Sequence, residues 1–384
     1  MRSGQLIQQP EGYRAFIPAS VPPDPPIEMD QELVETLSRA DRALGRLDGV
    51  ASVVPNPDLF VAMYVRHEAV LSSQIEGTQS TLEDVLEFEA EGAKDRQPKD
   101  VEEVVNYVNA LNYGLKRLSE LPLSLRLVRE IHEKLLSGVR GQERNPGEFR
   151  DSQNWIGPQG CTLVTATFVP PPEHELPAAL GDLEKFLHDP RGLPPLIQCG
   201  IAHAQFETIH PFLDGNGRVG RLLITLLLCE SEILQRPLLY LSLYLKRNRT
   251  EYYDRLMAVR LKGDWEGWLK FFLRGVYEVS QSATETARAI LQLRDDNLRA
   301  VGNHLGSRSN YGIKLLDYLF EKPIISISMA KEHLDCAYGT AAKLIDQLAE
   351  IGLLQEITGG QRNRVFRYSP YLALFDTLSV SNPK

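Results

Sequence analysis

Residues 210–221, HPFLDGNGRVGR, bring a histidine, a carboxylate, glycines and two arginines together in one short segment. The Gly-Asn-Gly turn stands directly before the apolar run LLITLLLC, which favours a helix. Backbone N–H groups in such a turn and the positive end of the helix dipole converge on an anion. Arg218 and Arg221 share one face of the first helical turn, where two cations oppose the dipole unless a polyanion compensates them. The segment therefore indicates a phosphate-binding site.

Two residues beside this turn could act on a bound phosphate compound. Asp214 offers hard oxygen ligands of the kind that Mg²⁺ prefers. His210 lies just upstream and could act as the general base for an attacking hydroxyl. Taken singly, a histidine before proline is more often structural, and Asp-Gly-Asn-Gly is more often a simple turn. The ordered combination of these residues on a helix–turn–helix favours the functional interpretation over the structural one, and we expect a catalytic site.

Two common phosphate-binding motifs do not explain the segment. Gly215, Gly217 and Gly220 fit the spacing G-x-G-x-x-G, but that motif requires a buried strand before it. Residues 202–214 have a helical pattern followed by a turn, so the dinucleotide-binding interpretation fails. A Walker A motif is also excluded, because no Gly-Lys-Ser/Thr follows the glycines.

The elements that must position these residues have helical periodicity almost throughout. The pattern breaks between Pro146 and Pro172, where the β-branched segment 161–169 predicts a short strand or hairpin that would form a flap beside the site. Before it, Ser80 and Glu83 resemble a capping box at a helix start. The predicted helices lie within residues 30–50, 57–77, 78–92, 101–120, 124–139, 176–189, 193–210, 222–234, 242–263 and 265–297.

The C-terminal segment has a different pattern. Three helical stretches are followed by LLQEITGG and NRVFRYS, a strand–turn–strand pattern. This order is typical of a winged helix-turn-helix, with residues 340–354 as the recognition-type helix. Arg362, Arg364 and Arg367 would give the wing a positive face. A DNA partner and a protein partner both stay open from the sequence.

The composition is that of an ordinary globular protein with more than one domain. The chain has 384 residues, of which 43% are hydrophobic and 24% charged, and a net charge of −9 that argues against wholesale coating of nucleic acid. The apolar runs are too short for a membrane span, and the first residues lack the apolar segment of a secretory signal. The four cysteines have neither paired nor metal-ligand spacing. We expect a cytoplasmic location and no membrane partner.

Residues 210–221 resemble the Fic family motif HPFx(D/E)GNGRxxR at every fixed position. Upstream, SSQIEG resembles the family's inhibitory motif (S/T)xxxE(G/N) through Ser72, Glu76 and Gly77. The layout is similar to that of stand-alone bacterial Fic adenylyltransferases. The resemblance implies an all-α Fic core with a short β-hairpin flap, followed by a C-terminal winged helix-turn-helix domain. The implied divisions are a proline-rich arm (1–28), a helical region with the inhibitory helix (29–105), the Fic core (106–275), a linker helix (276–303) and the winged helix (304–384).

The resemblance also implies a role for each matching residue. His210 would be the base that takes the proton from a Ser, Thr or Tyr hydroxyl of a target protein, while AMP is transferred from ATP. Asp214 would hold Mg²⁺ on the phosphates, and Glu76 would pair with Arg221 and so inhibit the enzyme. The flap would pair with the target's backbone. The implied nucleotide-binding set is Glu76, Thr165, Ala166, Thr167, Phe168, Gly215, Asn216, Gly217, Arg218, Val219, Gly220, Arg221, Tyr252 and Tyr253.

Several alternatives stay open. One is a nucleotide-sensing regulator, in which the Fic core binds ATP and the winged helix binds DNA. Another is a Fic enzyme with different chemistry, such as phosphocholine transfer, phosphorylation or removal of AMP. Tyr252 and Tyr253 could equally be packing residues at helical spacing. A homodimer is compatible with the sequence, which gives no sign of the identity of the target.

Overall fold

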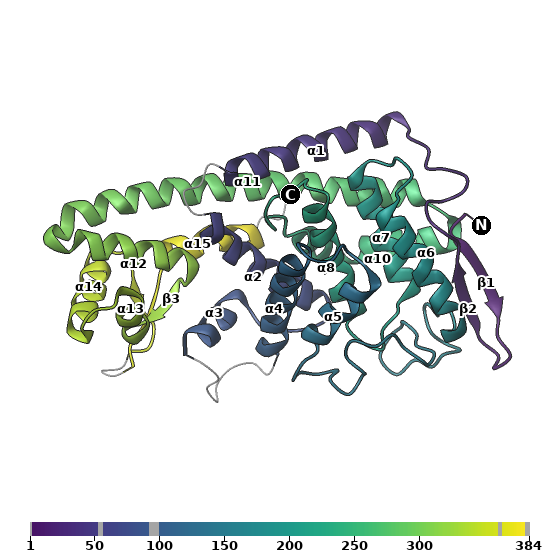
Figure 1. The fold of residues 1–384 in the computed structure, drawn as a ribbon, viewed down its shortest axis with the longest axis horizontal. Helices are drawn as coiled ribbons and strands as arrows, with labels where there is room; N and C mark the ends of the chain where they lie inside the picture. The colour runs from purple at the N-terminus through teal and green to yellow at the C-terminus, as the bar shows by residue number, and fades with distance from the viewer. Residues whose placement is uncertain (1, 53–56, 92–99, 360–362, 381–384) are drawn as a thin grey trace.

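The computed structural model describes residues 2–52, 57–91, 100–359 and 363–380. The molecule is elongated and mostly helical (Figure 1). Helix α11 (Trp265–His304) has 40 residues and runs along one side, and α1 (Gln31–Ser52) packs lengthwise against it. The region expected as a separate linker helix, 276–303, lies within α11 and continues without a break from residues 265–275. No described helix is both long and apolar enough to cross a bilayer.

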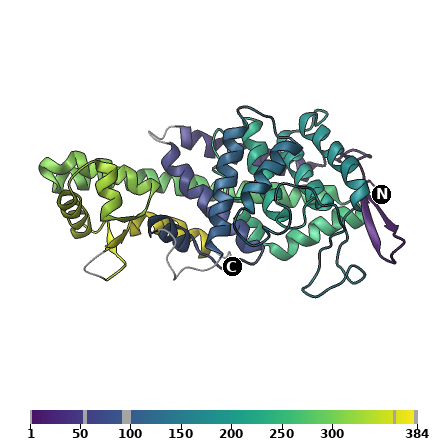
Figure 2. The same cartoon turned by 60° about the horizontal axis from the view of Figure 1, so that its bottom comes forward.

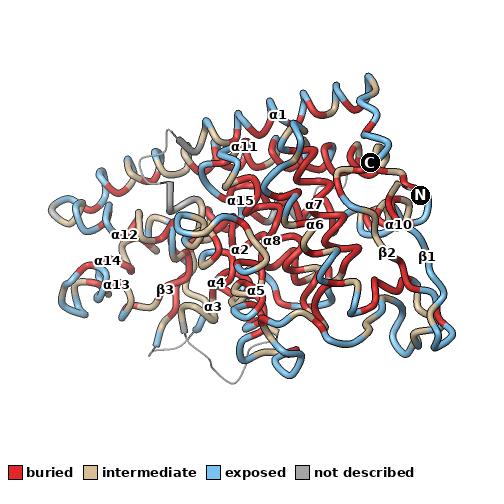
Figure 3. Tube along the Cα trace, turned by 45° about the vertical axis from the view of Figure 1, so that its right-hand side comes forward, coloured by how far each residue is buried: buried red, intermediate tan, exposed pale blue. Residues whose placement is uncertain are grey.

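Most of the remaining helices lie beneath α11 and α1, and their facing sides form the core, which is buried most deeply around α7 and α8 (Figure 3). The boundary expected between residues 105 and 106 falls inside α4. These helices are α2 (Pro57–Ile75), α3 (Leu82–Glu91), α4 (Val101–Arg117), α5 (Leu125–Leu135), η1 (Glu173–Glu175), α6 (Leu176–His188), α7 (Pro195–Ile209), α8 (Asn216–Glu230), α9 (Ser242–Arg247) and α10 (Arg249–Lys262).

Residues 1–28, expected as an extended arm, contain an antiparallel hairpin of β1 (Gly4–Gln8) and β2 (Arg14–Pro18). The hairpin lies at the opposite end of the molecule from the C-terminal module (Figures 1 and 2). Phe16 is buried, with its ring centroid 5.9 Å from that of Phe168, and its N–H donates to the carbonyl of Val169 at 2.9 Å. Apolar residues of β2 therefore anchor the arm on the segment that precedes the site.

The expected flap strand over residues 161–169 does not form. Residues 161–167 are a loop with a turn, in which Thr165 N donates to Thr162 O, and Ile156 and Phe168 make an isolated antiparallel bridge. The β-branched residues favour a strand locally. Pro158 and two neighbouring glycines, however, prevent the segment that would pair with this strand from becoming extended. The flap is therefore a loop closed by one bridge.

The C-terminal module follows α11 and the short helix η2 (Gly306–Arg308). Its strands form a three-stranded antiparallel sheet in the order β3-β5-β4, and α15 returns from it to pack on α11. The elements are α12 (Ser309–Glu321), β3 (Ile324–Ser326), α13 (Ile327–Leu334), α14 (Tyr338–Glu350), β4 (Gln355–Glu356), β5 (Val365–Arg367) and α15 (Ser369–Val380).

Two of the three arginines expected to form a positive face on this module are paired with carboxylates. Arg364 pairs with Glu356 at 2.9 Å and with Asp346 at 3.1 Å. Arg367 pairs with Glu83 in the first turn of α3. The third arginine of the prediction, at position 362, lies outside the described residues. The two described arginines are neutralised by carboxylates, so the positive face predicted from the sequence is absent at these positions.

Candidate active site

Helices α7 and α8 position the motif. α7 is buried along almost its whole length and ends at His210, whose backbone is left-handed with φ 50°. Arg150 holds this conformation, because its Nε donates to the His210 carbonyl at 3.0 Å. Asn154 Nδ2 donates to the same oxygen at 3.2 Å. A left-handed histidine is strained, and these bonds fix it in place.

A cavity of about 380 Å³ opens beside the turn between the two helices. Of the predicted site residues, it brings together those expected to act as the base, the metal ligand, the anion-binding turn, one arginine and the inhibitory carboxylate. The lining residues are Glu76, Arg140, His210, Leu213, Asp214, Gly215, Asn216, Gly217 and Arg218.

The His210 imidazole is neutral and has a nitrogen available for a proton. Burial, followed by the positive charges of Arg260 and Arg150, lowers its pKa to about 3. Its Nδ1 has no hydrogen-bond partner among the described residues. A neutral ring on the wall of the cavity can accept a proton from a hydroxyl placed there.

The turn before α8 is held by its own side chains. Gly215 has φ 77°, which favours glycine. Asn216 Oδ1 accepts from Phe212 N, and its Nδ2 donates to Phe212 O, each at 2.8 Å. A Cβ at Gly217 would overlap Glu76 Oε1, so a larger residue here would displace the paired carboxylate. The turn thus leaves backbone N–H groups at the N-terminus of α8 beside the cavity.

Glu76 reaches Arg221 from a distant part of the chain. Arg221 Nη2 donates to Glu76 Oε1 at 2.6 Å, and its Nε donates to Ser72 Oγ at 2.8 Å. Burial would raise the pKa of Glu76, but the positive charge of Arg221 outweighs it, and the pKa is lowered. The carboxylate is therefore ionised and paired. Gly77 follows directly with φ 102°, which lets the chain turn away.

Arg218 has a partner that the sequence pattern did not reveal. Its Nη1 donates to Glu103 Oε2 of α4 at 3.1 Å, and it is 3.8 Å from Asp214 Oδ1. Glu103 also pairs with Arg140 at 3.3 Å, a cation on the cavity wall that was not predicted. Glu103 is 4% exposed. An acidic residue on the apolar face of a predicted helix was the available signal.

Asp214 can serve as a metal ligand only together with groups of a bound molecule. Its side chain is 39% exposed, and Oδ1 accepts from Gly215 N at 2.6 Å. The described residues contain no cluster of three or more metal-binding side chains. Mg²⁺ commonly uses one or two carboxylates, with phosphate oxygens and water completing its shell, so a single carboxylate beside an anion-binding turn fits this ion.

His132 fixes the backbone of Asp214 and was also missed. Its Nδ1 accepts from Gly147 N at 2.9 Å, so its Nε2 carries the proton and donates to the Asp214 carbonyl at 3.0 Å. The ring stacks on Phe212 with centroids 3.7 Å apart. Burial lowers the pKa of His132 to about 4, which agrees with the neutral tautomer.

Two further residues of the motif lie behind the cavity. Val219 is fully buried, and a Cβ at Gly220 would lie 2.5 Å from Glu207 Oε1. Burial raises the pKa of Glu207 to about 7. This carboxyl group, on the buried α7, is another residue beside the motif that the sequence analysis did not predict.

The expected flap and tyrosine contacts do not line the cavity. Thr165 and Thr167 are exposed and Ala166 is half-buried. Phe168 is buried, with the Arg260 guanidinium 3.9 Å from its ring centroid. The two predicted tyrosines, Tyr252 and Tyr253, belong to α10.

Tyr252 is buried, and its OH is 2.9 Å from His203 Nε2. Tyr253 is 36% exposed, with its ring centroid 5.0 Å from that of Tyr252. Burial and the nearby charge of Glu76 raise the pKa of Tyr253 to about 12. The pair therefore lies within electrostatic range of Glu76 and Arg221, and Tyr252 also has a packing role.

Two family models match consecutive parts of the chain. The model of the Fic/DOC family N-terminal region matches residues 34–116, and that of the Fic/DOC family matches residues 122–228. The first match contains the helix that carries Glu76, and the second contains residues 210–221. The two matched regions therefore contribute both sides of the Glu76–Arg221 pair.

Curated relatives have related names. A probable protein adenylyltransferase of Aquifex aeolicus is 27% identical over 51% of this chain and 55% of its own length. The protein adenylyltransferase Fic of Aedes aegypti is 31% identical over 39% of this chain and 27% of its own length. The chain thus spans about half or less of these relatives.

Solved structures share the fold. A Fic family protein from Desulfovibrio desulfuricans superposes with a TM-score of 0.58 and 19% identity, covering 89% of this chain and 97% of that one. A Fic domain containing signaling protein from Bacteroides thetaiotaomicron has a TM-score of 0.51 and 18% identity, covering 67% and 97%. The first match extends the shared fold well beyond the two regions that the family models match.

Proposed function

Because the chain belongs to the Fic/DOC family, we propose that it is a protein adenylyltransferase that transfers AMP from ATP to a hydroxyl of a target protein and of itself. The observation that carries the proposal is His210, a neutral imidazole with an unpartnered nitrogen on the same cavity wall as Asp214 and the Gly215–Gly217 turn. A base, a carboxylate and an anion-binding turn are what transfer of a phosphoryl-type group requires.

In the proposed reaction, His210 takes the proton of the target hydroxyl as its oxygen attacks the α-phosphorus of ATP. The new P–O bond forms while the bond to pyrophosphate breaks, and pyrophosphate leaves with its electron pair. Backbone N–H groups of the turn stabilise the charge on the phosphoryl oxygens. Asp214 would hold Mg²⁺, which neutralises charge on the phosphates when bound.

We further propose that Glu76 inhibits the reaction. Its carboxylate occupies the buried Arg221 guanidinium at 2.6 Å, and Arg221 is the cation that would otherwise hold the terminal phosphate. A nucleotide that cannot use Arg221 would bind with its α-phosphate misaligned, and positioning is the main source of catalysis in this type of transfer.

The division of the chain is part of the same proposal. The arm, inhibitory region, core and long helix would lead into a winged helix-turn-helix module formed by 304–384. The support is the pair α13 and α14 followed by β4 and β5, with β3 at the edge of the sheet. A protein partner for this module is favoured over DNA, because Arg364 and Arg367 are paired with carboxylates.

Label transfer tests the proposed reaction. Purified protein with Mg²⁺ and ATP labelled at the α-phosphate should label itself, and ATP labelled at the γ-phosphate should not. His210→Ala should abolish labelling while nucleotide binding stays within a few-fold, because the imidazole acts mainly in the transition state. Label from the γ-position would indicate phosphorylation instead, and full activity of His210→Ala would disprove the role of the base.

A further inference from the structure

A second cavity, of about 560 Å³, lies between the helix that carries Glu76 and the C-terminal helix. Its walls come from α2, α9, α15 and residues 81–83, so it is separate from the cavity beside His210. Val70, Leu243 and Phe375 give it a buried apolar surface. Its volume lies within the range of about 300–1,000 Å³ that is usual for small-molecule sites.

The exposed side of this cavity is positively charged. Lys246 and Arg247 follow each other at the end of α9, and both are exposed. Lys246 Nζ donates to the neutral amide of Gln74 at 2.6 Å, and no carboxylate pairs with it among the described residues. The acidic residue on the wall, Glu83, is already paired with Arg367. The cavity therefore combines an apolar interior with cations on its exposed side.

His67 adds an unsatisfied polar group to the wall. It is 3% exposed, and its Nδ1 has no hydrogen-bond partner among the described residues. Its ring packs against Tyr240 and Phe375. Burial, with smaller contributions from Lys246 and Arg247, lowers its pKa to about 4, so the ring is neutral. An unpaired buried nitrogen is costly, and a bound polar group could satisfy it.

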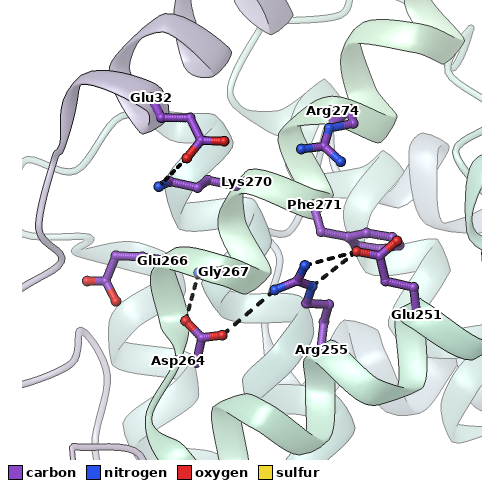
Figure 4. A pocket seen from close by; sticks show the side chains of 9 residues that line it. All are labelled: Glu32, Glu251, Arg255, Asp264, Glu266, Gly267, Lys270, Phe271 and Arg274. Atoms are coloured by element: carbon purple, nitrogen blue, oxygen red, sulfur yellow. Dashed lines mark hydrogen bonds and ion pairs between the residues drawn. The ribbon is translucent and has the colours of Figure 1, made fainter.

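Another cavity of the molecule offers a comparison, because two of its lining cations, Arg255 and Lys270, are already paired with carboxylates (Figure 4). It lies among α1, α10 and α11, where Lys270 pairs with both Asp30 and Glu32 at 2.7 Å. Arg255 pairs there with Glu251 at 3.0 Å. These cations already have carboxylate partners, whereas Lys246 has only an amide. That lining also has four carboxylates and three cations, whereas the lining beside α2 has one carboxylate and two cations, so an anion is better accommodated beside α2.

We propose that the cavity between α2, α9 and α15 binds a small organic anion with an apolar body, carrying a carboxylate or a phosphate monoester. Lys246 would contact the anionic group, and Val70, Leu243 and Phe375 would contact the apolar body. This arrangement matches an amphipathic ligand in both charge and size.

The same helix connects this cavity to the proposed inhibition. Val70 and Gln74 line the cavity from α2, and Arg221 is contacted by Ser72 of the same helix and by Glu76 directly after its end. A ligand that fits the cavity while Glu76 is paired stabilises that arrangement, because it binds this state better than one with α2 displaced. On the proposed function, such a ligand lowers AMP transfer.

Binding is tested on the full chain without ATP, so that the result does not depend on the proposed reaction. Octanoate and octyl phosphate serve as anionic probes, and 1-octanol is the uncharged control, each followed by calorimetry and thermal shift. Saturable binding of either anion, with octanol much weaker, is expected. Lys246→Met should weaken binding about fivefold, as loss of an exposed ionic contact does. Lys262→Met, at an exposed lysine of α10, should not change it.

Three results would overturn the site: no saturable binding, octanol bound as tightly as octanoate, or equal affinities in Lys246→Met and Lys262→Met. Coupling is tested separately by label transfer from ATP. The bound probe should reduce transfer by the wild type and leave Glu76→Gly unaffected. Equal inhibition of both would overturn the coupling through α2. Absence of transfer in every variant would overturn the proposed function, and the binding result would stand independently.

Discussion

His210 must be both unprotonated and correctly oriented to act as a base. Its left-handed backbone is held by Arg150 and Asn154, and burial, followed by the positive charges of Arg260 and Arg150, keeps the imidazole unprotonated before the reaction. Arg150 therefore contributes both to the orientation of His210 and to its unprotonated state. The negative charge of Glu76 raises the pKa of His210, but this charge is paired with Arg221. At neutral pH the imidazole is ready to accept a proton without any prior deprotonation.

The pH dependence of transfer follows from this. Since burial lowers the pKa of His210 to about 3, the base form is fully populated above that value. The rate of label transfer should change by no more than about twofold between pH 6 and pH 8. A tenfold loss per pH unit below 6.5, absent from a nucleotide-binding control at the same pH, would mean that His210 titrates like an ordinary exposed histidine.

At the scale of elements, close packing of α7 on α11 sets where His210 lies. Gly200 of α7 faces Leu269 and Phe272, and its carbonyl accepts from Trp268 Nε1 at 2.8 Å. A Cβ at Gly200 would lie 2.8 Å from Leu269 Cδ2. The small residue therefore allows the two helices to approach closely.

Gly200→Ala should consequently destabilise the protein. Overpacking costs about 1–3 kcal/mol, and the better helix propensity of alanine recovers up to about 1 kcal/mol of this. We expect urea denaturation to give an unfolding free energy lower by about 1 kcal/mol. Gly181→Ala in α6 is the matched control, because nothing lies within 4 Å of the added Cβ, and it should be neutral or stabilising. A stabilised Gly200→Ala would show that α7 and α11 are not tightly packed here.

Contiguous features of the site could be predicted from the sequence, whereas features that depend on the approach of distant helices could not. The turn and the helix start at residues 215–221 are local, and their positions follow from glycine and apolar periodicity. Glu103 meets Arg218 from 115 positions away, which only the packing of α4 on α8 determines. The Glu76–Arg221 contact was expected from a family resemblance and not from spacing.

Local signals also misplaced elements. The capping box near α3 is formed by Thr81 and Asp84, whose side chains each accept the other's N–H, one residue later than expected. Ser80 Oγ instead donates to Asp100 at 2.6 Å. By local rules, a capping box that begins at Ser80 is as suitable as one that begins at Thr81. The tertiary hydrogen bond from Ser80 to Asp100 decides in favour of the box that begins at Thr81.

At the scale of the whole molecule, α2 connects the C-terminal module to the site. Its Tyr64 and His67 contact Phe375 of α15. Arg66 pairs with Glu89 at 2.7 Å, and Glu89 also pairs with Lys322 at the end of α12. The C-terminal module therefore packs on the same helix whose end leads directly into Glu76.

The contact should make the two parts unfold together. Phe375 is 1% exposed, and Phe375→Ala should cost about 3–5 kcal/mol of unfolding free energy through the cavity that it leaves. Tyr338→Ala, at an aromatic residue that is 52% exposed, should change stability by no more than about 0.5 kcal/mol. Denaturation followed by circular dichroism and by tryptophan fluorescence should give coincident transitions. Separate transitions in the wild type would show that the module is independent of α2.

The most direct test of the account compares Glu76→Gly with the double variant Glu76→Gly/His210→Ala in label transfer from α-labelled ATP. The bond to Arg221 is charge-assisted, and such bonds contribute about 1.5–3 kcal/mol, so its removal should raise self-labelling by roughly 10–100-fold over the wild type. The double variant should remain unlabelled. A Glu76→Gly rate equal to that of the wild type would contradict inhibition by Glu76, and labelling of the double variant would contradict catalysis by His210.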